Sequence, residues 1–451
     1  MMRCMFSGVS SLRAHQEKMD VIGNNIANVN TVGFKSGRVT FSDVFSQTMS
    51  GASAPDSSTG RAGTNPRQIG LGVGVQAIDT IMTRGGTEST GNQTDLAING
   101  NGFFIVRSGH TGSYLFTRAG NFIVDKTGNL TTSDGLNVYG WMDYGGRQQA
   151  DGTYEFDIDK PVEAINIYSD AYNKSKNILA AKATEYATFD GNLDSSEPAV
   201  STTSKTMPTT YDTQYSTTLT VYDSLGESYE VQVNLTKCFV DGSDAADPKT
   251  EWFWEIPASS GLSITDGSGF LRFDGKGNLI GDDAFPIKQS VKFEPGKSVG
   301  SAPFTVEIDF TNISMSSADS SVQSDRVDGY PSGTLEDFSI GNDGIIMGVY
   351  SNGKQQPLGM IAMAVFDNPA GLAKNGSNTY VATSNSGDFT NGVKVGSEGS
   401  GALKAGSLEM SNVDLSNEFS SLIITQRGFQ AGSRVITTAD EMLQELVNLK
   451  R

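Results

Sequence analysis

The feature of this sequence that most constrains its fold is a matching hydrophobic stripe at each end of the chain. Within residues 413–451, apolar side chains fall on a series whose steps alternate between four and three: Leu415, Phe419, Leu422, Phe429, Ile436 and Leu443, with polar residues such as Gln426 between them. Residues 1–30 repeat this spacing in Met5, Val9, Leu12, Met19 and Ile26. Steps of four and three form the seam of a coiled-coil helix. The sequence therefore predicts two terminal helices.

These helices have two interpretations: they pair within one chain and close a monomer, or they assemble many copies. The apolar residues of the N-terminal stripe supply about 10 kcal/mol when buried. Ordering the same helix costs about 1 to 2 kcal/mol per residue. Gly428 and Gly432 each cost the C-terminal helix about 1 kcal/mol relative to Ala. A lone pair of helices is therefore marginal, and we predict that both helices are assembly elements.

The charge of the chain argues against two classes of partner. Lys plus Arg amount to 33 and Asp plus Glu to 51, a net charge of −18, and no block of basic residues occurs. Such a chain is not attracted to nucleic acid or to an anionic membrane surface. The 52 Gly and 13 Pro residues favour many short strands joined by tight turns.

No segment has the pattern of a secretory signal or a membrane span. The two cysteines, Cys4 and Cys238, lie far apart in sequence, so a disulfide framework is not expected. The first residues lack the charged and apolar regions of a cleavable signal, and no run approaches the ~18 apolar residues that span a bilayer. A cytoplasmic enzyme and a protein exported by a signal-independent machine both fit these observations.

The sequence offers little catalytic or metal-binding chemistry. Its two histidines, His15 and His110, have no Cys or His companions at metal-ligand spacing, and no G-x-S-x-G segment accompanies them. The acidic segments 125–129 and 274–278 lack the ligand set of an EF-hand, so they are predicted to be β-turns rather than calcium loops. We expect no catalytic residue, no metal site and no cofactor.

An Asn-rich motif follows the N-terminal stripe. The segment from Val21 reads VIGNNIANVNTVGFKSGRVTFSDVF, and its key positions are Asn24, Asn25, Asn28, Gly33, Phe34 and Lys35. Asn and Gly tolerate the left-handed conformation in which helices end, so a helix stop is one interpretation. The segment also closely resembles the amino-terminal signature of the bacterial flagellar axial proteins, the rod and hook family, in which an NNIAN turn precedes a TxGFK element.

Further stretches carry the resemblance. IGLGVGVQAID and the later DLAINGNGFFIV are similar to the hook pattern of a GLGV strand that leads into a DLAIxGxGFF strand. The segment TVYDSLGESYEVQV is similar to a hairpin in the outer domain of hook proteins. Independently of the resemblance, apolar runs bounded by turn residues predict short strands at 96–98, 102–106, 114–118, 121–124, 130–132 and 137–141.

The expected fold class is multi-domain and mainly β, with paired N- and C-terminal α-helices that form a coiled-coil-like inner domain. Period-two alternation without a convincing helix marks residues 168–330 as an inserted outer β-domain. The other expected parts are a terminal helical domain at 1–30 plus 413–451, a connector at 31–85, and a split β-domain at 86–167 plus 331–412. The first helix is expected to begin near Ser7, and Asp414 or Ser411 is expected to cap the last.

The resemblance implies a structural subunit of the flagellar hook, which self-assembles into a curved, flexible tube that transmits motor torque and encloses an export channel. The implied partners are further copies of the chain, other axial proteins of the rod, the hook–filament junction and the hook cap, and the flagellar export apparatus. The implied location is the basal body and hook, outside the cell after export through the channel. Enzyme activity, nucleic-acid binding and membrane insertion are not expected.

Two alternatives stay open. One is a distal rod protein of the same family, and the other is a secreted β-rich protein that binds carbohydrate or calcium. Rod proteins of the family generally lack a large outer insertion, so the insertion favours the hook subunit.

Overall fold

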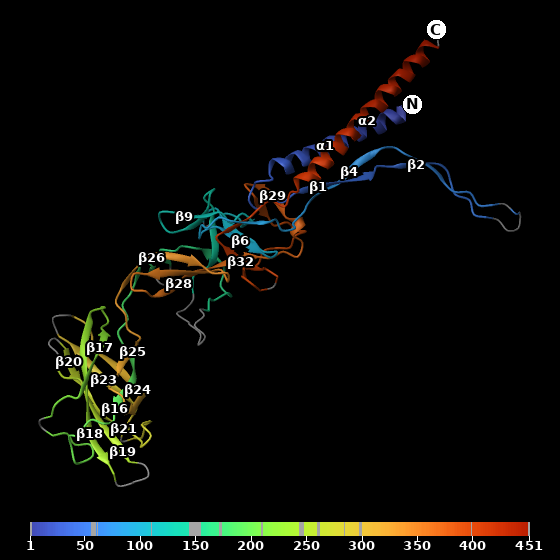
Figure 1. The fold of residues 1–451 in the computed structure, drawn as a ribbon. Helices are drawn as coiled ribbons and strands as arrows, with labels where there is room; N and C mark the ends of the chain where they lie inside the picture. The colour runs from blue at the N-terminus through green and yellow to red at the C-terminus, as the bar shows by residue number, and fades with distance from the viewer. Residues whose placement is uncertain are drawn as a thin grey trace. The chain divides into compact units, whose positions relative to one another are not determined.

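The structure is a computed structural model, and the chain divides into two compact units (Figure 1). The residues described are 2–55, 60, 62–109, 111–143, 155–170, 174–208, 211–242, 248–258, 262–283, 285–296, 300–397 and 399–449. Unit 1 comprises Met1–Lys176, Phe338–Gly348 and Gln356–Arg451, and unit 2 comprises Asn177–Asp337 and Val349–Gln355. Unit 2 overlaps the expected insertion, but the four-part division of the chain stays a prediction.

Two long helices of unit 1 lie at the two ends of the chain. Helix α1 spans Met2–Ala27 and helix α2 spans Leu415–Asn448. They lie side by side and antiparallel (Figure 1), since Gly8 near the start of α1 lies against Ile436 in the second half of α2. The fold class expected from the sequence is therefore confirmed at both ends. Among the described residues, no helix combines the length and the apolar character that a membrane crossing requires.

The helix boundaries agree with expectation at α2 and not at α1. Asp414 caps α2, because its carboxylate accepts hydrogen bonds from two backbone N–H groups of the first turn at 2.9 and 3.3 Å. Helix α1 begins at Met2 rather than near Ser7, so that expectation was wrong. Residues 2–6 contain neither Gly nor Pro, and nothing in them interrupts a helix.

The segment between α1 and the β-domain forms two antiparallel ladders. Its strands are β1 (Gly37–Asp43), paired with β4 (Val73–Thr80), and β2 (Ser46–Ser50), paired with β3 (Arg67–Gly70). The expected connector at 31–85 therefore contains paired strands. Gly72 has a φ of +126°, and a Cβ at this position would collide with Ser10 of α1. Glycine thus lets the start of β4 approach the helix closely.

The β-domain of unit 1 is built from two separate stretches of the chain. Its strands are β5 (Thr87–Ser89), β6 (Leu96–Asn99), β7 (Phe103–Arg107), β8 (Leu115–Thr117), β9 (Phe122–Val124), β10 (Leu130–Thr132), β11 (Asn137–Trp141), β12 (Glu163–Ala164), β13 (Ser169–Asp170), β14 (Lys174–Ser175), β28 (Gln355–Ala364), β29 (Ala373–Gly376), β30 (Thr379–Val381), β31 (Val393–Lys394), β32 (Ala402–Ala405) and β33 (Ser407–Glu409), with a 3₁₀ turn at Pro369–Gly371. The strands expected between residues 96 and 141 are confirmed to within one residue at each end.

Strands from the two stretches pair with each other. Strand β28 pairs with both β7 and β11, β30 pairs with β8, and β32 pairs with β6. Phe103, Trp141 and Met360 share one buried apolar cluster. The stretches before and after unit 2 therefore form one β-domain.

Unit 2 contains two five-stranded sheets that enclose a common core. One sheet has β16 (Tyr186–Asp194), β20 (Leu262–Thr265), β23 (Lys288–Pro295), β24 (Phe304–Ser316) and β25 (Gln323–Val327), and the other has β17 (Tyr215–Tyr222), β18 (Ser228–Asp241), β19 (Lys249–Glu255), β21 (Ser268–Phe273) and β22 (Leu279–Ile280). Phe189 and Ile308 from the first sheet and Trp252 and Trp254 from the second belong to one buried cluster, as in a β-sandwich. The expected hairpin is confirmed by the pairing of β17 with β18.

The chain enters and leaves unit 2 through paired strands. Strand β15 (Ile178–Leu179) pairs with β26 (Gly333–Ile340). Strand β27 (Ile345–Tyr350) follows, and β26, β27 and β28 each carry residues of both units.

The acidic turns are closed by their own side chains. The carboxylates of Asp125 and Asp274 each accept hydrogen bonds from backbone N–H groups two and four residues later. Gly128 and Gly277 supply the left-handed conformation, with φ values of +90° and +84°. The interpretation of both segments as β-turns is confirmed.

Asp309 on β24 is a carboxylate of unit 2 whose charged form is stabilised by several hydrogen bonds. It accepts hydrogen bonds from Tyr186 and Thr311, and the Lys288 ammonium lies 3.3 Å away. Burial raises the pKa of Asp309, but the hydrogen bonds from Thr311 and Tyr186 outweigh burial and lower it from 3.8 to about 2. Because this folded pKa is depressed, the carboxylate stabilises unit 2 above about pH 4, and its contribution is lost as the pH falls through about 2.

We expect Asp309→Asn to lower the free energy of unfolding of unit 2 by about 2 kcal/mol at neutral pH, and this difference from the wild-type chain to vanish near pH 2. Urea unfolding followed by tryptophan fluorescence measures it, because Trp252 and Trp254 are buried in unit 2. Asp325→Asn, at an exposed position on β25, is the matched control and should change little at either pH. A difference that stayed constant down to pH 2 would contradict the expectation.

Candidate assembly site at the paired terminal helices

The two terminal helices approach each other through small residues. A Cβ at Gly8 would lie 3.0 Å from Ile436 Cγ1, and a Cβ at Gly428 would lie 2.7 Å from the His15 ring. Gly432, one turn beyond Gly428, is buried. A larger side chain at Gly428 would collide with the imidazole, so the close approach of the helices requires glycine there.

The buried face of α2 differs in part from the predicted seam. Its buried and half-buried residues include Leu422, Thr425, Phe429, Gly432, Ile436, Ala439 and Leu443. The predicted residues Leu422, Phe429, Ile436 and Leu443 belong to this face, but Leu415 and Phe419 are exposed. Between these large residues lie three small ones at seven-residue spacing, Thr425, Gly432 and Ala439, which allow α1 to come close. The role of all these residues in a seam between copies stays a prediction.

Helix α1 is covered on two sides, by α2 and by the ladder of β1 and β4. Its fully buried residues are Gly8, Ala14, Ile22 and Asn25. Of its predicted seam residues, Met5, Leu12, Met19 and Ile26 are half-buried and Val9 is exposed. The predicted stripe of α1 therefore lies beside its most buried face, and its role between copies stays a prediction.

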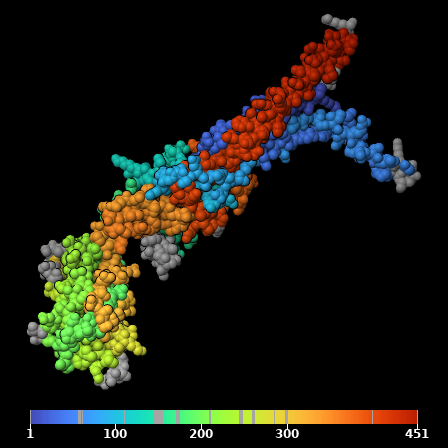
Figure 2. Space-filling model, in the orientation of Figure 1, coloured from blue at the N-terminus to red at the C-terminus, as the bar shows by residue number. Residues whose placement is uncertain are grey.

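Large apolar side chains remain exposed on both helices. They are Met2, Phe6 and Val9 on α1, and Leu415, Phe419, Ile423, Ile424, Val435, Met442, Leu446 and Val447 on α2, with Leu449 directly after it. Ile424 is 69% exposed, and in Figure 2 α2, coloured red, lies uncovered on the face drawn. Exposed apolar groups gathered on one element are typical of a surface that another molecule covers.

The Asn residues of the motif hold the end of α1. The Asn28 amide donates to the Asn24 carbonyl at 2.9 Å, which closes the last turn. Asn25 is buried, and its amide accepts a hydrogen bond from the Gly37 N–H at 2.9 Å and donates to the Gly37 carbonyl at 2.8 Å. It also donates to Glu418 of α2 at 3.1 Å. Asn25 therefore joins α1, β1 and α2, which a helix stop alone would not require.

Lys35 belongs to a group of three buried charges. Its Nζ lies 2.6 Å from one carboxylate oxygen of Glu409 and donates to the Thr83 carbonyl at 2.8 Å. Arg118 Nη1 lies 3.3 Å from the other Glu409 oxygen and donates to the Gly100 carbonyl at 2.9 Å. The three charged side chains are at most 2% exposed. Lys35, Glu409 and Arg118 are called the buried ionic cluster below.

Burial dominates the electrostatics of the buried ionic cluster. It lowers the pKa of Lys35, and the Glu409 carboxylate opposes that shift. It lowers the pKa of Arg118 as well, again against the attraction of Glu409. Removing Glu409 would leave two cations without a counter-charge away from water, whereas removing either cation leaves Glu409 paired with the other. Breaking one buried ion pair by removing a partner typically costs about 3 to 5 kcal/mol.

Gly33 and Phe34 fit the motif against the β-domain. Gly33 has a φ of +69°, and a Cβ there would lie 2.7 Å from the backbone nitrogen of Ala119, so glycine is required. The Gly33 N–H donates to the Glu409 carbonyl at 2.7 Å. Phe34 is buried, and the Lys374 ammonium lies 5.1 Å from the centre of its ring. The TxGFK element is thus the segment that docks the end of α1 on the β-domain.

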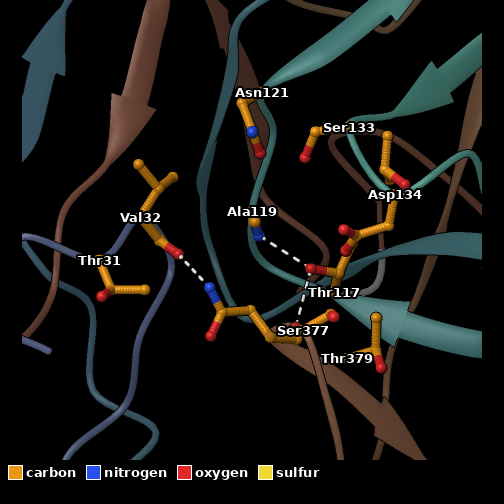
Figure 3. A pocket seen from close by; sticks show the side chains of 11 residues that line it. Thr31, Val32, Thr117, Ala119, Asn121, Ser133, Asp134, Ser377 and Thr379 are labelled. Carbon is orange, nitrogen blue, oxygen red and sulfur yellow. Dashed lines mark hydrogen bonds between the residues drawn. The ribbon is translucent and has the colours of Figure 1, made fainter.

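A polar cavity of about 330 Å³ lies beside this docking segment (Figure 3). The Asn378 amide donates to the Val32 carbonyl at 3.1 Å, and the Thr117 hydroxyl donates to the Asn378 carbonyl at 2.9 Å. Hydroxyl and amide groups line the cavity together with one carboxylate, Asp134. Its described lining contains no histidine, cysteine or lysine.

Reasoning from the sequence missed Glu409, Arg118 and Asn412. Asn412 accepts a hydrogen bond from the Ser36 N–H at 2.8 Å and donates to the Ile81 carbonyl at 2.8 Å. Each of the three residues acts on a segment far away in sequence. The one local signal is the acidic side chain of Glu409 within the otherwise uncharged segment SLEMSNV.

Metal-binding chemistry is absent from the part of the chain that the structure describes, where no group of three His, Cys, Asp or Glu residues could hold an ion. His15 lies between the helices, and His110 lies outside the described residues.

We expect Lys35→Met to lower the free energy of unfolding of unit 1 by about 3 kcal/mol, because the buried Glu409 carboxylate loses its partner at 2.6 Å and keeps Arg118, at 3.3 Å, as its counter-charge. Hydrogen exchange should show this as faster exchange of backbone amides in residues 31–36 and 404–412. The matched control is Arg38→Met, which removes an exposed pair with Asp79 at 3.5 Å and should cost less than about 1 kcal/mol. Equal effects of the two substitutions would show that the buried ionic cluster has no special role.

Four family models match four separate stretches of the chain. The model described as flagella basal body rod protein matches residues 5–35, and the flagellar hook protein FlgE/F/G D1 domain matches residues 97–174. The flagellar basal body protein FlaE D2 domain matches residues 188–330, and the flagellar basal body rod FlgEFG protein C-terminal model matches residues 404–449.

Curated relatives match over the full length. The chain is 38% identical to the flagellar hook protein FlgE of Treponema pallidum and 38% identical to that of Borreliella burgdorferi, with 100% of both chains covered in each case. It is 31% identical to the flagellar basal-body rod protein FlgG of Bacillus subtilis, also with 100% of both chains covered. At this identity and coverage, the chain belongs to the flagellar hook protein FlgE family, within the wider group of rod and hook axial proteins.

Proposed function

We propose that the chain is a structural subunit of the flagellar hook and polymerises into a curved, flexible tube. The observation that carries the proposal is the helix pair, which is fastened to the β-domain by the buried ionic cluster and still presents exposed apolar side chains. Such a surface requires a cover in the functional protein. Since the relatives of the chain are named hook proteins, further copies of the chain are the fitting cover.

Each part of the chain has a role in this proposal. The terminal helices, at 1–30 and 413–451, form an inner tube around an export channel. The split β-domain, at 86–167 and 331–412, forms the layer around it. The outer insertion, at 168–330, makes the outermost contacts between neighbouring copies. Sliding at these outer contacts allows the tube to bend while it transmits motor torque.

The proposed partners follow from this arrangement. Besides further copies of the chain, they are the rod, the hook–filament junction and the hook cap, which continue the same axis. The flagellar export apparatus carries the subunit through the channel to its final position outside the cell. The subunit has no catalytic role in this proposal.

The rod-protein alternative keeps some support from the comparisons. The relative named as a rod protein covers 100% of the chain, so the presence of the insertion does not by itself separate hook from rod. Identity favours the hook, at 38% for hook relatives against 31% for this rod relative. Full-length relatedness to axial proteins also argues against the second alternative, a secreted carbohydrate- or calcium-binding protein.

Electron microscopy of the concentrated purified chain tests the proposal. The wild-type chain should form tubes, whereas Leu422→Glu and Ile436→Glu should form none, because each substitution places an unpaired charge in a packed helix face. Thermal unfolding of unit 2 should be unchanged in both variants, which separates loss of assembly from loss of folding.

The matched control for these variants is Thr218→Glu, which adds the same charge to an exposed position of unit 2, the part that this proposal treats as dispensable for tube formation, and should leave assembly intact. Dispersed particles of the wild-type chain would contradict the proposed polymer. Tubes formed by Ile436→Glu would remove this residue from the seam.

The insertion should be dispensable for tube formation and necessary for bending. Leu179 of β15 is paired directly with Gly333 of β26, so the two ends of unit 2 are adjacent. We expect a variant in which residues 180–332 are replaced by a short Gly and Ser linker to form straight tubes with the inner layer retained. The remaining strands of unit 1 pair among themselves and do not need the deleted sheets.

Cryo-electron microscopy of this variant distinguishes three outcomes. Straight tubes would support the proposal that the inner parts form the tube and that the insertion allows it to bend. Curved tubes would assign bending to another part of the chain, and an unfolded or unassembled product would show that unit 1 depends on unit 2 for its folding.

A further inference from the structure

His15 lies where α1, α2 and β1 meet. Its ring sits over Gly428 of α2, where a Cβ would lie 2.7 Å from the ring atoms Cε1 and Nε2. The ring also makes a T-shaped contact with Phe41 of β1, with the ring centres 5.7 Å apart. The imidazole is therefore held between two uncharged groups from two different elements.

The surroundings of His15 do not favour a charged ring. Its Nδ1 atom is buried and has no hydrogen-bond partner. On α1 the charged group that acts on the ring is the Lys18 ammonium, which lies 5.6 Å from the centre of the Phe41 ring that contacts His15. The groove lined by His15 carries one charged residue among its described lining, and this residue is another cation, Arg3. From α2 and β1, the groups that face the ring are the uncharged Gly428 and Phe41.

Protonation would therefore oppose the pairing of the helices. Burial, and after it Lys18, lower the pKa of His15 below its ordinary value of 6.5. In an unpaired α1 the ring is exposed to water and regains the ordinary pKa. The unpaired helix thus binds more protons than the paired helix, so pairing is stabilised above about pH 6.5 and weakens as the pH falls below it.

We propose that His15 makes the pairing of α1 with α2, and through it the polymerisation of the subunit, sensitive to mild acid. The titrating group is itself part of the contact between the helices, because the His15 ring packs on Gly428 of α2 and does so best when neutral. This proposal rests on the function proposed above, in which the helix pair is the assembly element.

Sedimentation of polymer from the full-length chain at pH about 7.5 and about 5.5 tests the proposal. If only the unpaired helix takes up the proton, the concentration of unassembled wild-type subunit should rise up to about tenfold between these pH values. In His15→Gln, which retains a polar side chain without a titration in this range, it should stay constant. A constant wild-type value would overturn the proposal, as would an equal rise in His15→Gln.

His110→Gln is the matched control, because it removes the other histidine of the chain and leaves His15 alone. The rise should persist in this variant, and its loss would assign the titration to His110 and overturn the proposal. If His15→Gln fails to polymerise at pH about 7.5, the rise in His110→Gln still shows whether the titrating histidine is His15 or His110. Failure of the wild-type chain to polymerise at that pH would contradict the proposed function instead. NMR titration of the unassembled chain then tests His15 itself, provided that contacts between the His15 ring and Gly428 show the helices to be paired. A pKa at or above 6.5 in that paired state would overturn the switch.

Discussion

Unit 1 depends on the burial of one carboxylate, that of Glu409, between two cations. Lys35 follows α1, Arg118 belongs to the β-domain, and Glu409 closes the last strand before α2. A buried ion pair adds little net stability, because the loss of hydration offsets most of the attraction. It does penalise every arrangement in which one charge lacks its partner. We infer that the buried ionic cluster acts mainly on specificity, since its three charges are paired in only one relative position of the two chain ends on the β-domain.

The relative position of the two chain ends also determines how α1 and α2 contact each other. Once their bases are fixed, α1 and α2 are brought together by Asn25 and Glu418 near the cluster and by Gly428 and Gly8 farther along. Contact through small residues brings the backbones close but buries little apolar area, so the larger side chains remain on the outer faces. The charges at the base of the helices are thus paired within the chain, while large apolar side chains of both helices stay uncovered, which is what the proposed contacts between copies would need.

The sequence predicted much of the fold and less of the site, for a physical reason. The strands between 96 and 141 and the hairpin of unit 2 were correct, because alternation and turn residues are local signals. The predicted stripe of α2 agrees only in part with its buried face: it includes Ile436 but not Thr425 or Ala439, since small residues carry no hydrophobic signal. Its role between copies stays a prediction. Glu409 could not be found at all, because its partner Lys35 lies at the other end of the chain.

The topology separates the folding of the β-domain of unit 1 from that of the two sheets of unit 2. Strands from either side of the insertion pair directly, as β28 does with β7 and β32 with β6, so the β-domain is closed without any strand from the two sheets of unit 2. The insertion departs and returns at neighbouring backbone positions, since Leu179 and Gly333 are paired. Changes inside unit 2 therefore need not disturb the pairing that holds the buried ionic cluster. The buried ionic cluster therefore constrains the chain ends and the β-domain, and it places no such constraint on the two sheets of unit 2.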